Sequence, residues 1–355
     1  MTTTKAIERV LISGGGSGGH IFPAIAIADA LKDAHPGVEI LFVGAKGKIE
    51  MEKVPKAGYK IKGLWISGFH RGEIWRNLLF PLKLIVSLFK AYGIIRRFRP
   101  QVVVGVGGFA SGPTLEVASR LGIPSLIQEQ NSFPGKTNRL LAAKAHKICV
   151  AYEGLERYFP KEKIVLTGNP VRKDLTDLGA HKEQALKHFG MATAKGVIVL
   201  VGGSLGARSL NRAMRANADL LKRHQDVQVL WQAGKLYIDE YAECETARLP
   251  NVKISAFIDR MDLAYSMADV LICRAGALTI SELSIIGKPA ILIPSPNVAE
   301  DHQTHNAKAL VERDAAVLVK DAEAAAEMIP KAISLLGQAD RRAEISENIL
   351  AMKQK

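Results

Sequence analysis

Short apolar runs alternate with longer helical segments along the whole chain of 355 residues, and this alternation limits the possible folds more than any other feature. Most of the runs are continuous in Val, Ile and Leu, which is typical of parallel strands that helices cover on both faces. The helices between such strands supply the crossover connections. The sequence therefore predicts two doubly wound α/β domains that bind ligands at the carboxyl ends of their strands. The predicted strands are residues 9–13, 38–43, 101–106, 124–128 and 147–150 in the first half, and 197–201, 227–232, 252–255, 270–273 and 290–293 in the second.

The boundary between the two domains is predicted near Gly168-Asn169-Pro170-Val171. A chain of this length suits two domains of ordinary size better than one. We therefore expect a first domain over residues 1–170 and a second over 171–340, with a polar connector that contains a short helix at 176–196. The last helix, from about Arg341 onward, could pack on either domain.

The composition excludes several classes of protein. With 48% hydrophobic residues and no low-complexity tract, the chain is expected to be globular rather than disordered. Cys149, Cys244 and Cys273 have neither metal-binding nor disulfide spacing, which favours a reducing compartment, and the polar segment Met1 to Glu8 predicts no signal peptide. The net charge of +13 indicates an acidic partner, such as a phosphorylated substrate or an anionic lipid. Nucleic acid is the weaker choice, because no helix-turn-helix, zinc-finger spacing or aromatic RNA-binding signature is found.

Two glycine-rich loops lie where a predicted strand passes into a helix. The first, Ser13-Gly14-Gly15-Gly16-Ser17-Gly18-Gly19-His20, precedes a helix predicted over Ile21 to Ala34, with Pro23 in its first turn. The second, Gly202-Gly203-Ser204-Leu205-Gly206-Ala207, follows the predicted strand 197–201. Such loops direct backbone N–H groups and the positive end of the helix dipole at one point, which suits a phosphate or a developing negative charge. One loop in each half suggests two nucleotide-type domains that face one cleft.

The first loop also matches the dinucleotide fingerprint Gly-x-Gly-x-x-Gly at Gly14, Gly16 and Gly19. A dehydrogenase would place an acidic residue at the end of the next strand to hold the ribose, and Leu41 to Lys46 contains none. We therefore count against NAD and expect no cofactor. The pattern leaves two interpretations of His20 open: an inert polar residue in the first turn of a helix, or a general base beside the converging N–H groups.

Two further motifs have both a structural and a functional interpretation. Gly105 to Pro113 contains a third glycine-rich turn, which either cradles a diphosphate together with the first loop or only needs glycine conformations. Thr279-x-x-Glu282 is a formal capping box, whereas Glu282 in a switch-point crevice would accept hydrogen bonds from both ribose hydroxyls. His302 and His305 lack a third ligand at metal-binding spacing, and the chain has no Asp-x-Asp of the kind that holds a metal in metal-dependent glycosyltransferases. We therefore predict no metal site.

Residues 74–99 are rich in apolar side chains, but charged residues and Pro81 interrupt them too often for a membrane span. Lys83, Lys90 and Arg97 recur every seven residues and so share one helical face. The apolar side chains of another face are Leu82, Ile85, Val86 and Phe89. This pattern fits a basic amphipathic helix on an anionic membrane surface, and it also fits a core-packing helix with a solvated charged face.

Taken together and in this order, the motifs resemble those of the MurG family, the UDP-N-acetylglucosamine:lipid-linked muramoyl-pentapeptide transferases of bacterial cell-wall synthesis. The resemblance covers nearly the whole chain, and Ser17 stands where a threonine is frequent. It implies the GT-B fold, in which a deep cleft separates two doubly wound domains, and a C-terminal helix (about 341–355) that packs back on the first domain. The motifs that carry it are Gly14 to His20, Gly105 to Gly112, Gln128-Glu129-Gln130-Asn131, Gly168 to Arg172, Gly202 to Ala207, Phe257-Ile258-Asp259, Ala277 to Glu282 and Gln303 to Asn306.

The resemblance implies an inverting glycosyltransferase that needs neither a metal nor another cofactor. It would move GlcNAc from UDP-GlcNAc to the C4 hydroxyl of MurNAc in lipid I (undecaprenyl-pyrophosphoryl-MurNAc-pentapeptide). The product would be lipid II for peptidoglycan synthesis, which supports cell shape and cell division. His20 matches the candidate base of the family.

The resemblance also implies the binding residues. Of these, Asn131, Arg172 and Ser204 would approach the sugar and the diphosphate, Ile258 would contact uracil, Glu282 would hold the ribose and Gln303 would reach the GlcNAc hydroxyls. The whole implied donor site is Ser17, Gly18, Gly19, Asn131, Arg172, Ser204, Ile258, Ala277, Leu278, Thr279, Ile280, Ser281, Glu282 and Gln303. The loop residues implied to face the diphosphate of the acceptor are Gly15, Gly16, Gly107, Gly108 and Ser111.

A lipid-linked acceptor cannot leave the bilayer. The resemblance therefore implies that the amphipathic stretch is a docking surface for an anionic membrane. The residues implied in this patch are Trp75, Leu79, Lys83, Phe89, Lys90 and Arg97. The protein is then expected as a peripheral protein at the cytoplasmic face of the bacterial inner membrane. Other cell-wall synthesis proteins are further expected partners, and nucleic acid is not.

Two other functions fit parts of the pattern. A UDP-GlcNAc 2-epimerase would bind the same donor on the same fold, but it needs carboxylates beside the sugar rather than an acceptor platform. A membrane-associated nucleotide-sugar sensor would keep the donor pocket without needing His20. Turnover without acceptor would favour the epimerase, and binding without turnover would favour the sensor.

Overall fold

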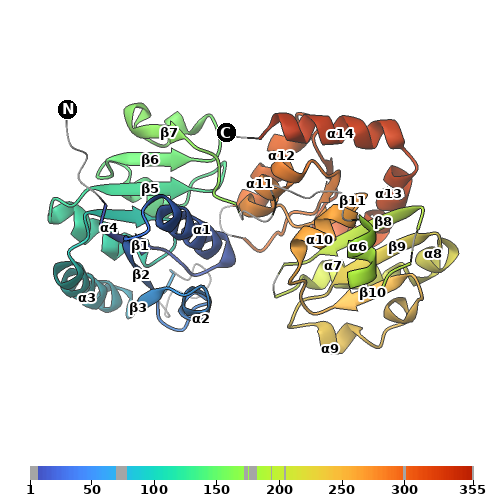
Figure 1. The fold of residues 1–355 in the computed structure, drawn as a ribbon, viewed down its shortest axis with the longest axis horizontal. Coiled ribbons are helices and arrows are strands. Elements are labelled where there is room, and N and C mark those ends of the chain that lie inside the picture. The colour runs from blue at the N-terminus through green and yellow to red at the C-terminus, as the bar shows by residue number, and fades with distance from the viewer. Residues whose placement is uncertain are drawn as a thin grey trace. The chain divides into compact units, whose positions relative to one another are not determined.

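The computed structural model describes residues 7–68, 78–171, 175, 182–192, 194–203, 205–298 and 301–353. Contacts within the chain divide it into two units, Met1–Val171 and Arg172–Lys353. Each unit is an α/β domain built on one parallel sheet (Figure 1), so the predicted fold class is confirmed. Within the described ranges, no helix has the length and apolar character needed to cross a bilayer.

The described part of the first unit contains a sheet of seven parallel strands in the order β3-β2-β1-β4-β5-β6-β7. β1 lies between β2 and β4, so Leu11 stands opposite Leu41 on one side and Val103 on the other. The strand order reverses between β1 and β4, and the carboxyl ends at such a switch point are where open α/β sheets bind ligands. The strands are β1 Arg9–Ser13, β2 Glu39–Ala45, β3 Lys60–Leu64, β4 Val102–Gly105, β5 Ser125–Glu129, β6 Lys147–Val150 and β7 Ile164–Leu166.

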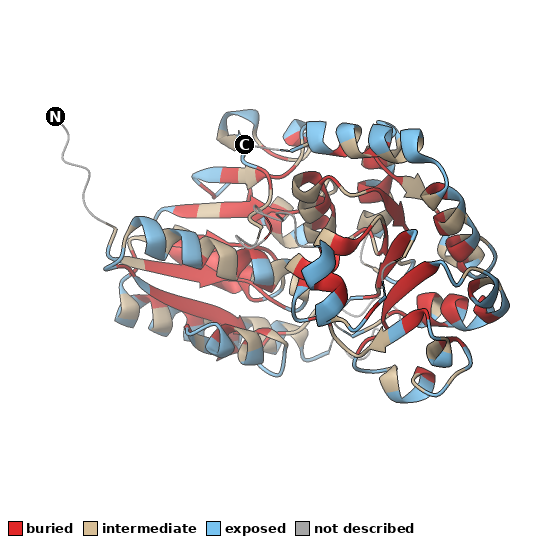
Figure 2. Ribbon diagram, turned by 45° about the vertical axis from the view of Figure 1, so that its right-hand side comes forward, coloured by how far each residue is buried: buried red, intermediate tan, exposed pale blue. Residues whose placement is uncertain are grey.

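Helices cover both faces of this first sheet. The side chains of β1 point alternately to the two faces of the sheet. Val10 and Ile12 are buried in the core beside α1 and α2, and Leu11 is buried in the core beside α3, α4 and α5. Figure 2 shows the result in each unit, with buried strands and exposed outer helix faces. The helices are α1 Gly18–Ala34, α2 Glu50–Lys56, α3 Phe80–Phe98, α4 Ser111–Arg120 and α5 Lys136–Leu141, with short 3₁₀ helices η2 Leu155–Arg157 and η3 Lys161–Lys163.

The sheet of the second unit has six parallel strands in its described part, in the order β10-β9-β8-β11-β12-β13. β8 lies between β9 and β11, and Leu200 stands opposite Trp231 and Ile272. The order reverses between β8 and β11, which creates a second switch point. The strands are β8 Gly196–Val201, β9 Val227–Gln232, β10 Val252–Ser255, β11 Val270–Cys273, β12 Ala290–Leu292 and β13 Val317–Leu318.

α7 and α13 pack together over one face of the second sheet, where Leu210, Trp231 and Met328 are fully buried. α6 packs against α10, and it is the short helix that was predicted within the polar connector. The helices are α6 Lys182–His188, α7 Arg208–Ala216, α8 Ala218–Arg223, α9 Ile238–Tyr241, α10 Met261–Met267, α11 Ala277–Ile286, α12 His302–Val311, α13 Ala324–Leu336 and α14 Ala339–Ala351, with 3₁₀ helices η5 Thr246–Arg248 and η7 Asp321–Glu323.

The last helix, α14, packs against α11 and α13 of the second unit. Its Ile345 and Ile349 are fully buried, and the Ser346 hydroxyl donates to the carbonyl of Gly287. That this segment also packs back on the first domain stays a prediction. The two apolar side chains on the buried face of the helix are already used within the second unit.

All ten strands predicted from the sequence are present, with each end within two residues of its predicted position. Three strands that the sequence did not predict, β3, β7 and β13, lie at sheet edges. α1 begins at Gly18, three residues before the predicted start at Ile21. Ser17, in extended conformation, is its N-cap, so Gly18, Gly19 and His20 form the first turn.

Candidate functional site

The first glycine-rich loop follows β1 at the switch point of the first sheet. Gly15 and Gly16 have positive φ values of 141° and 91°, and a Cβ on Gly15 would stand 2.1 Å from Oε1 of Glu50. The Glu50 side chain is fully buried and accepts hydrogen bonds from the backbone N–H of Gly16 (2.9 Å) and of Ala45 (2.9 Å). A buried carboxylate therefore holds the shape of this loop. It also engages the Gly16 N–H, which a phosphate could otherwise have used.

The third glycine-rich turn follows β4 and packs directly against the first loop. Gly107 and Gly108 have φ values of 88° and 84°, and a Cβ on Gly108 would stand 2.0 Å from the carbonyl oxygen of Gly15. Only glycine permits this approach of two backbones. Ser111 is fully buried, with Oγ 2.8 Å from the carbonyl oxygens of both Ser13 and Gly107, so its hydroxyl joins the turn to β1. The two loops form one surface at the switch point.

His20 lies in the first turn of α1, next to this surface. Its Nδ1 is 3.0 Å from the hydroxyl oxygen of Ser17, which uses its side chain on the imidazole instead of capping the helix. A Cβ on Gly107 would stand 2.9 Å from Nε2. When Nδ1 carries the proton and donates to Ser17, Nε2 is the nitrogen that can accept a proton. The ring is therefore oriented by one loop and faces the other.

The Gln128-Glu129-Gln130-Asn131 motif spans the end of β5, beside β4. Glu129 is buried and accepts from the backbone N–H of Asn131 (3.0 Å) and Gly135 (3.1 Å), and from the side-chain amides of Asn131 (3.1 Å) and Asn138 (2.8 Å). Burial raises the pKa of Glu129, and these four hydrogen bonds oppose the increase. Glu129 thus holds the side chain of Asn131, one of the predicted donor-site residues.

The second glycine-rich loop follows β8 at the switch point of the second sheet. Gly203 and Gly206 both have a φ of 88°, and the side-chain amide of Gln232 donates to the carbonyl of Gly203 at 2.7 Å. A Cβ on Gly206 would stand 2.1 Å from the carbonyl oxygen of Ala233. The loop is therefore closely packed against the end of β9. Ser204, which was predicted to contact the donor, lies outside the described residues.

α11 follows β11 on the other side of this switch point. Its N-cap is Gly276, which has no side chain to cap the helix, and Ala277, Leu278 and Thr279 are its first three residues. The capping-box interpretation of Thr279 is wrong, because the helix starts before it. A first turn without a side-chain cap directs its N–H groups out of the helix end, as a phosphate site requires.

Glu282 lies in the second turn of α11, and its carboxylate accepts a hydrogen bond from the hydroxyl of Tyr265 (2.7 Å). Tyr265 comes from α10, so the Glu282 carboxylate is oriented by a second helix. Ile280 and Ile258 are both only 2% exposed. Any contact of these two residues with a nucleotide therefore involves the backbone or a small part of the side chain.

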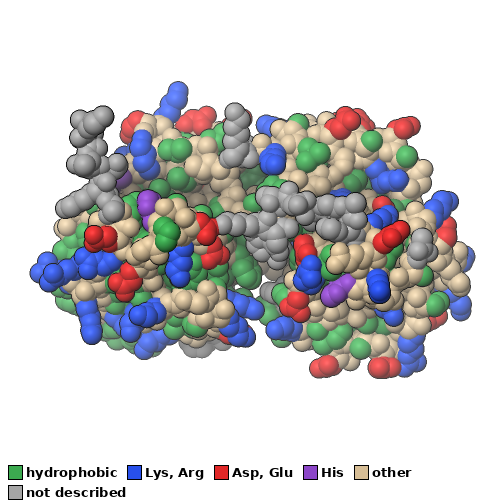
Figure 3. Space-filling model, viewed as in Figure 1, with side chains coloured by type: hydrophobic (Ala, Val, Ile, Leu, Met, Phe, Trp, Pro, Cys, Tyr) green, Lys and Arg blue, Asp and Glu red, His purple; other side chains and the backbone are tan. Residues whose placement is uncertain are grey.

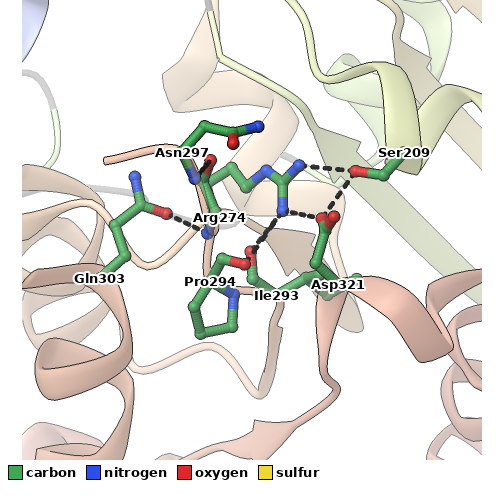
Figure 4. Close-up of polar contacts among 8 residues, drawn as sticks. Ser209, Arg274, Ile293, Pro294, Asn297, Gln303 and Asp321 are labelled. Carbon is green, nitrogen blue, oxygen red and sulfur yellow. Dashed lines mark hydrogen bonds and ion pairs between the residues drawn. The ribbon is translucent and has the colours of Figure 1, made fainter. Parts of the chain in front are cut away.

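A cavity of about 690 Å³ opens beside the second glycine-rich loop. Gln303 of α12 lines it, and its Oε1 accepts a hydrogen bond from the backbone N–H of Ser295 at 2.8 Å (Figure 4). The other lining residues are Gly202, Gly206, Ala207, Arg208, Ser209, Arg212, Tyr237, Arg274, Ser295, Asn297, Asp321, Ala322 and Ala325. The cavity is thus formed by loops and helices that follow β8, β9, β11, β12 and β13.

α3 exposes the apolar residues that the pattern placed on one of its faces. Phe89 is 75% exposed and Ile85 is 51% exposed, and Leu82 and Val86 are exposed as well. Leu79, the N-cap of the helix, is also exposed. The interpretation of these residues as a core-packing face is therefore wrong. The helix is instead held by its buried residues, which are Ser87, Ala91 and Ile95.

Figure 3 shows Lys and Arg side chains in the region of the first unit where Figure 1 places α3. Lys83 Nζ donates to Ser67 Oγ at 3.1 Å, and Lys90 Nζ donates to the carbonyl of Gly63 at 2.7 Å. Burial lowers the pKa of Lys90, and the charges of Lys46 and Lys62 lower it further, so several lysines gather at this edge. Arg97 is exposed, and Trp75 lies outside the described residues.

The structure assembles the predicted site residues as two groups, one in each unit. In the first unit it brings together Gly15, Gly16, Ser17, Gly18, Gly19, His20, Gly107, Gly108 and Ser111. In the second unit residues 202, 203 and 205–207, the first turns of α11 and Gln303 all lie at the carboxyl edge of the sheet, whereas Arg172 and Ser204 lie outside the described residues.

The sequence interpretation assigned no role to Glu50, Glu129 or Arg274. Glu129 lies inside the Gln128-Glu129-Gln130-Asn131 motif, and Arg274 directly follows the predicted strand 270–273. Their position at the ends of strands was the available signal. Glu50 stands in an ordinary polar segment, and nothing in its neighbours indicates that it is buried.

The chain matches the glycosyltransferase family 28 N-terminal domain over residues 10–150 and the glycosyltransferase family 28 C-terminal domain over residues 197–354. The UDP-N-acetylglucosamine--N-acetylmuramyl-(pentapeptide) pyrophosphoryl-undecaprenol N-acetylglucosamine transferase of Bacteroides fragilis is 53% identical over 343 residues, which cover 96% of this chain and 90% of that protein. The crystal structure of MurG from Acinetobacter baumannii matches with a TM-score of 0.76 and 30% identity, over 98% of this chain and 96% of that one. A crystal structure of a UDP-N-acetylglucosamine 2-epimerase matches with a TM-score of 0.64 over 97% of this chain and 91% of that one, but with 15% identity, so it shares the fold alone.

Proposed function

Because the chain belongs to the MurG family of glycosyltransferases, we propose that it transfers GlcNAc from UDP-GlcNAc to undecaprenyl-pyrophosphoryl-MurNAc-pentapeptide (lipid I) and so produces lipid II. The observation that carries this proposal is 53% identity, over 96% of the chain, to a transferase named for this reaction. The two parallel-sheet domains are those of the GT-B fold.

The first unit would bind the acceptor and accept its proton. The C4 oxygen of MurNAc attacks the anomeric carbon of GlcNAc, the bond from that carbon to UDP breaks, and the configuration inverts. His20 would take the proton of the attacking hydroxyl at Nε2, since Nδ1 is held by Ser17. The loops at the switch point would face the diphosphate of the acceptor, with Gly16 limited by its hydrogen bond to Glu50.

The second unit would bind the donor. The uncapped first turn of α11 presents N–H groups to the diphosphate, which would stabilise the charge of the departing UDP with fixed dipoles. Glu282, oriented by Tyr265, would accept hydrogen bonds from the ribose hydroxyls. Gln303 would reach the GlcNAc hydroxyls, and Arg172 and Ser204 keep their proposed roles at the sugar and the diphosphate.

A UDP-GlcNAc 2-epimerase is the runner-up, and the epimerase match shares only the fold. An epimerase needs carboxylates beside the sugar. The buried carboxylates Glu50 and Glu129 are instead each engaged by backbone N–H groups. Carboxylates held in this way can fix the shape of a loop. They are less suited to exchanging a proton at a sugar carbon.

The proposed function is tested by incubating the protein with labelled UDP-GlcNAc and a lipid I analogue in the presence of EDTA. We expect acceptor-dependent label in the lipid product. A matched reaction without acceptor separates the alternatives. Label in the 2-epimer without acceptor would indicate the epimerase, and donor binding without any turnover would indicate a nucleotide-sugar sensor.

We also propose that the exposed apolar face of α3 docks on an anionic membrane surface, which would bring the protein to the bilayer that holds its acceptor. Phe89, Ile85 and their neighbours would enter the interface, and the lysines beside them would meet anionic headgroups. The protein would then be a peripheral protein of the cytoplasmic face of the inner membrane, where other cell-wall synthesis proteins are candidate partners.

Replacing Ile85 and Phe89 together by Ser is expected to reduce binding to vesicles that contain anionic lipid by about tenfold or more, because two large exposed side chains lose their apolar burial in the membrane. Cosedimentation with such vesicles measures the effect. Leu236, which is also exposed but lies in the second unit, provides the matched control as Leu236→Ser. Equal losses in the two variants would refute docking through α3.

A further inference from the structure

Arg274 lies at the centre of a polar network in the cavity of the second unit (Figure 4). Its Nη1 pairs with Oδ1 of Asp321 at 2.5 Å, and its Nη2 donates to Oγ of Ser209 at 2.7 Å. Ser209 in turn donates to the same oxygen of Asp321 at 2.6 Å. The three side chains therefore form a closed triangle in which each contact joins a donor to an acceptor.

This triangle joins segments that are far apart in the sequence. Ser209 is the second residue of α7, Arg274 directly follows β11, and Asp321 is the first residue of η7. Each segment begins just beyond the carboxyl end of a strand of the same sheet. The side chains of Arg274 and Asp321 are only 16% and 21% exposed, so solvent screens their ion pair less than it would screen a surface pair.

Arg274 also holds the loop after β12. Its Nη1 approaches the carbonyl oxygens of Ile293 (3.0 Å) and Pro294 (3.3 Å). The next residue, Ser295, donates its backbone N–H to Oε1 of Gln303. A glutamine amide can present either its oxygen or its nitrogen by turning half a revolution. The hydrogen bond from Ser295 selects one orientation, in which Nε2 points away from the loop (Figure 4).

We propose that Asp321 is a positioning residue for donor recognition: with Ser209 it holds Arg274, Arg274 holds the loop 293–295, and this loop keeps the Gln303 amide turned so that Nε2 donates to an oxygen of the donor sugar. The inference rests on the proposed function, because Gln303 meets the sugar only in a UDP-GlcNAc site. Both terminal nitrogens of Arg274 donate within the protein, and in this proposal Arg274 acts through the loop that it holds.

The test is a set of titrations of UDP-GlcNAc and of UDP into the wild type, Asp321→Asn, Gln303→Ala and the double variant. Asn keeps the shape of the side chain but removes the charge that pairs with Arg274. We expect Asp321→Asn to weaken UDP-GlcNAc binding by about tenfold, as for the loss of a hydrogen bond at the sugar, and to leave UDP binding within about twofold. In the Gln303→Ala background, Asp321→Asn should have no further effect, because the amide that it positions is absent.

An equal loss of UDP and UDP-GlcNAc affinity in Asp321→Asn would overturn the inference, as would a tenfold loss that persists in the Gln303→Ala background. Asp314→Asn is the matched control, because Asp314 also pairs with an arginine of the second unit, Arg341 at 3.0 Å, but is exposed. Ser209→Ala keeps the charge pair and, should Asp321→Asn fail to fold, is expected to give a smaller loss that is also specific for UDP-GlcNAc. The lipid I transfer assay on the wild type tests the proposed function. The affinities for UDP-GlcNAc and for UDP test the role of Asp321 independently of that assay.

Discussion

Replacing His20 by Ala is expected to lower the turnover of GlcNAc transfer by about 10²-fold or more, while the affinity for UDP-GlcNAc stays nearly unchanged. The imidazole is held at Nδ1 by Ser17, and Nε2 faces Gly107. In the proposed mechanism the nucleotide is bound by the second unit, so the substitution removes the proton acceptor without removing a nucleotide contact. Turnover at saturating donor and a separate titration of UDP-GlcNAc measure the two quantities.

His188→Ala provides a control for this experiment, because His188 is an exposed residue of α6 that packs on Phe189. It should retain full turnover. Ser17→Ala is expected to cause a smaller decrease than His20→Ala, since it frees the ring but leaves the base in place. Full turnover in His20→Ala would mean that another group accepts the proton.

Replacing Glu50 by Gln is expected to destabilise the first unit by about 2 kcal/mol and to lower turnover as well. The Glu50 carboxylate accepts from the N–H groups of Gly16 and Ala45. A glutamine of the same shape has only one acceptor oxygen, so one of these buried N–H groups would face an NH₂ group. Because Gly16 directly precedes Ser17, the loosened loop would also misplace His20. Calorimetric unfolding and transfer kinetics measure the two effects.

Glu52→Gln is the matched control on the same helix. Glu52 is exposed and pairs with Lys56 at 2.7 Å, and exposed pairs of this kind contribute about 0.2–1 kcal/mol. We expect Glu52→Gln to leave the stability of the first unit and the turnover nearly unchanged. A Glu50→Gln variant that is as stable and as active as Glu52→Gln would show that the carboxylate does not shape the loop.

The internal strands could be predicted because burial on both faces requires a continuous apolar run. Val103 and Val104, for example, face opposite sides of the first sheet and are both buried. Of the edge strands, β10 was predicted, but β3, β7 and β13 were not. In β3, Lys60 and Lys62 are exposed on an edge strand, so the segment does not form an apolar run. β13 has only two residues, which is too short for a strand pattern.

The glycine-rich loops were located from the sequence, but the groups that hold them were not. A glycine indicates that the backbone needs space or a positive φ, and it does not indicate which neighbour requires this. For Gly15 the neighbour is the Glu50 carboxylate, 35 residues away in the chain, and for Gly206 it is the backbone near Gly234. The same limit explains why Thr279 was interpreted as a helix cap. Its spacing to Glu282 is right, but the helix already begins at Ala277.

The sequence by itself determined the parallel α/β class, ten of the strands, the family and the positions of the loops, because each depends on local composition or on motifs in a fixed order. Only the tertiary structure decided which face of α3 is exposed, where α14 packs and which carboxylates support the loops. It also decided that Ser209, Arg274 and Asp321 meet. These outcomes depend on contacts between residues far apart in the chain, and such contacts form only when the sheet brings the ends of its strands to one edge.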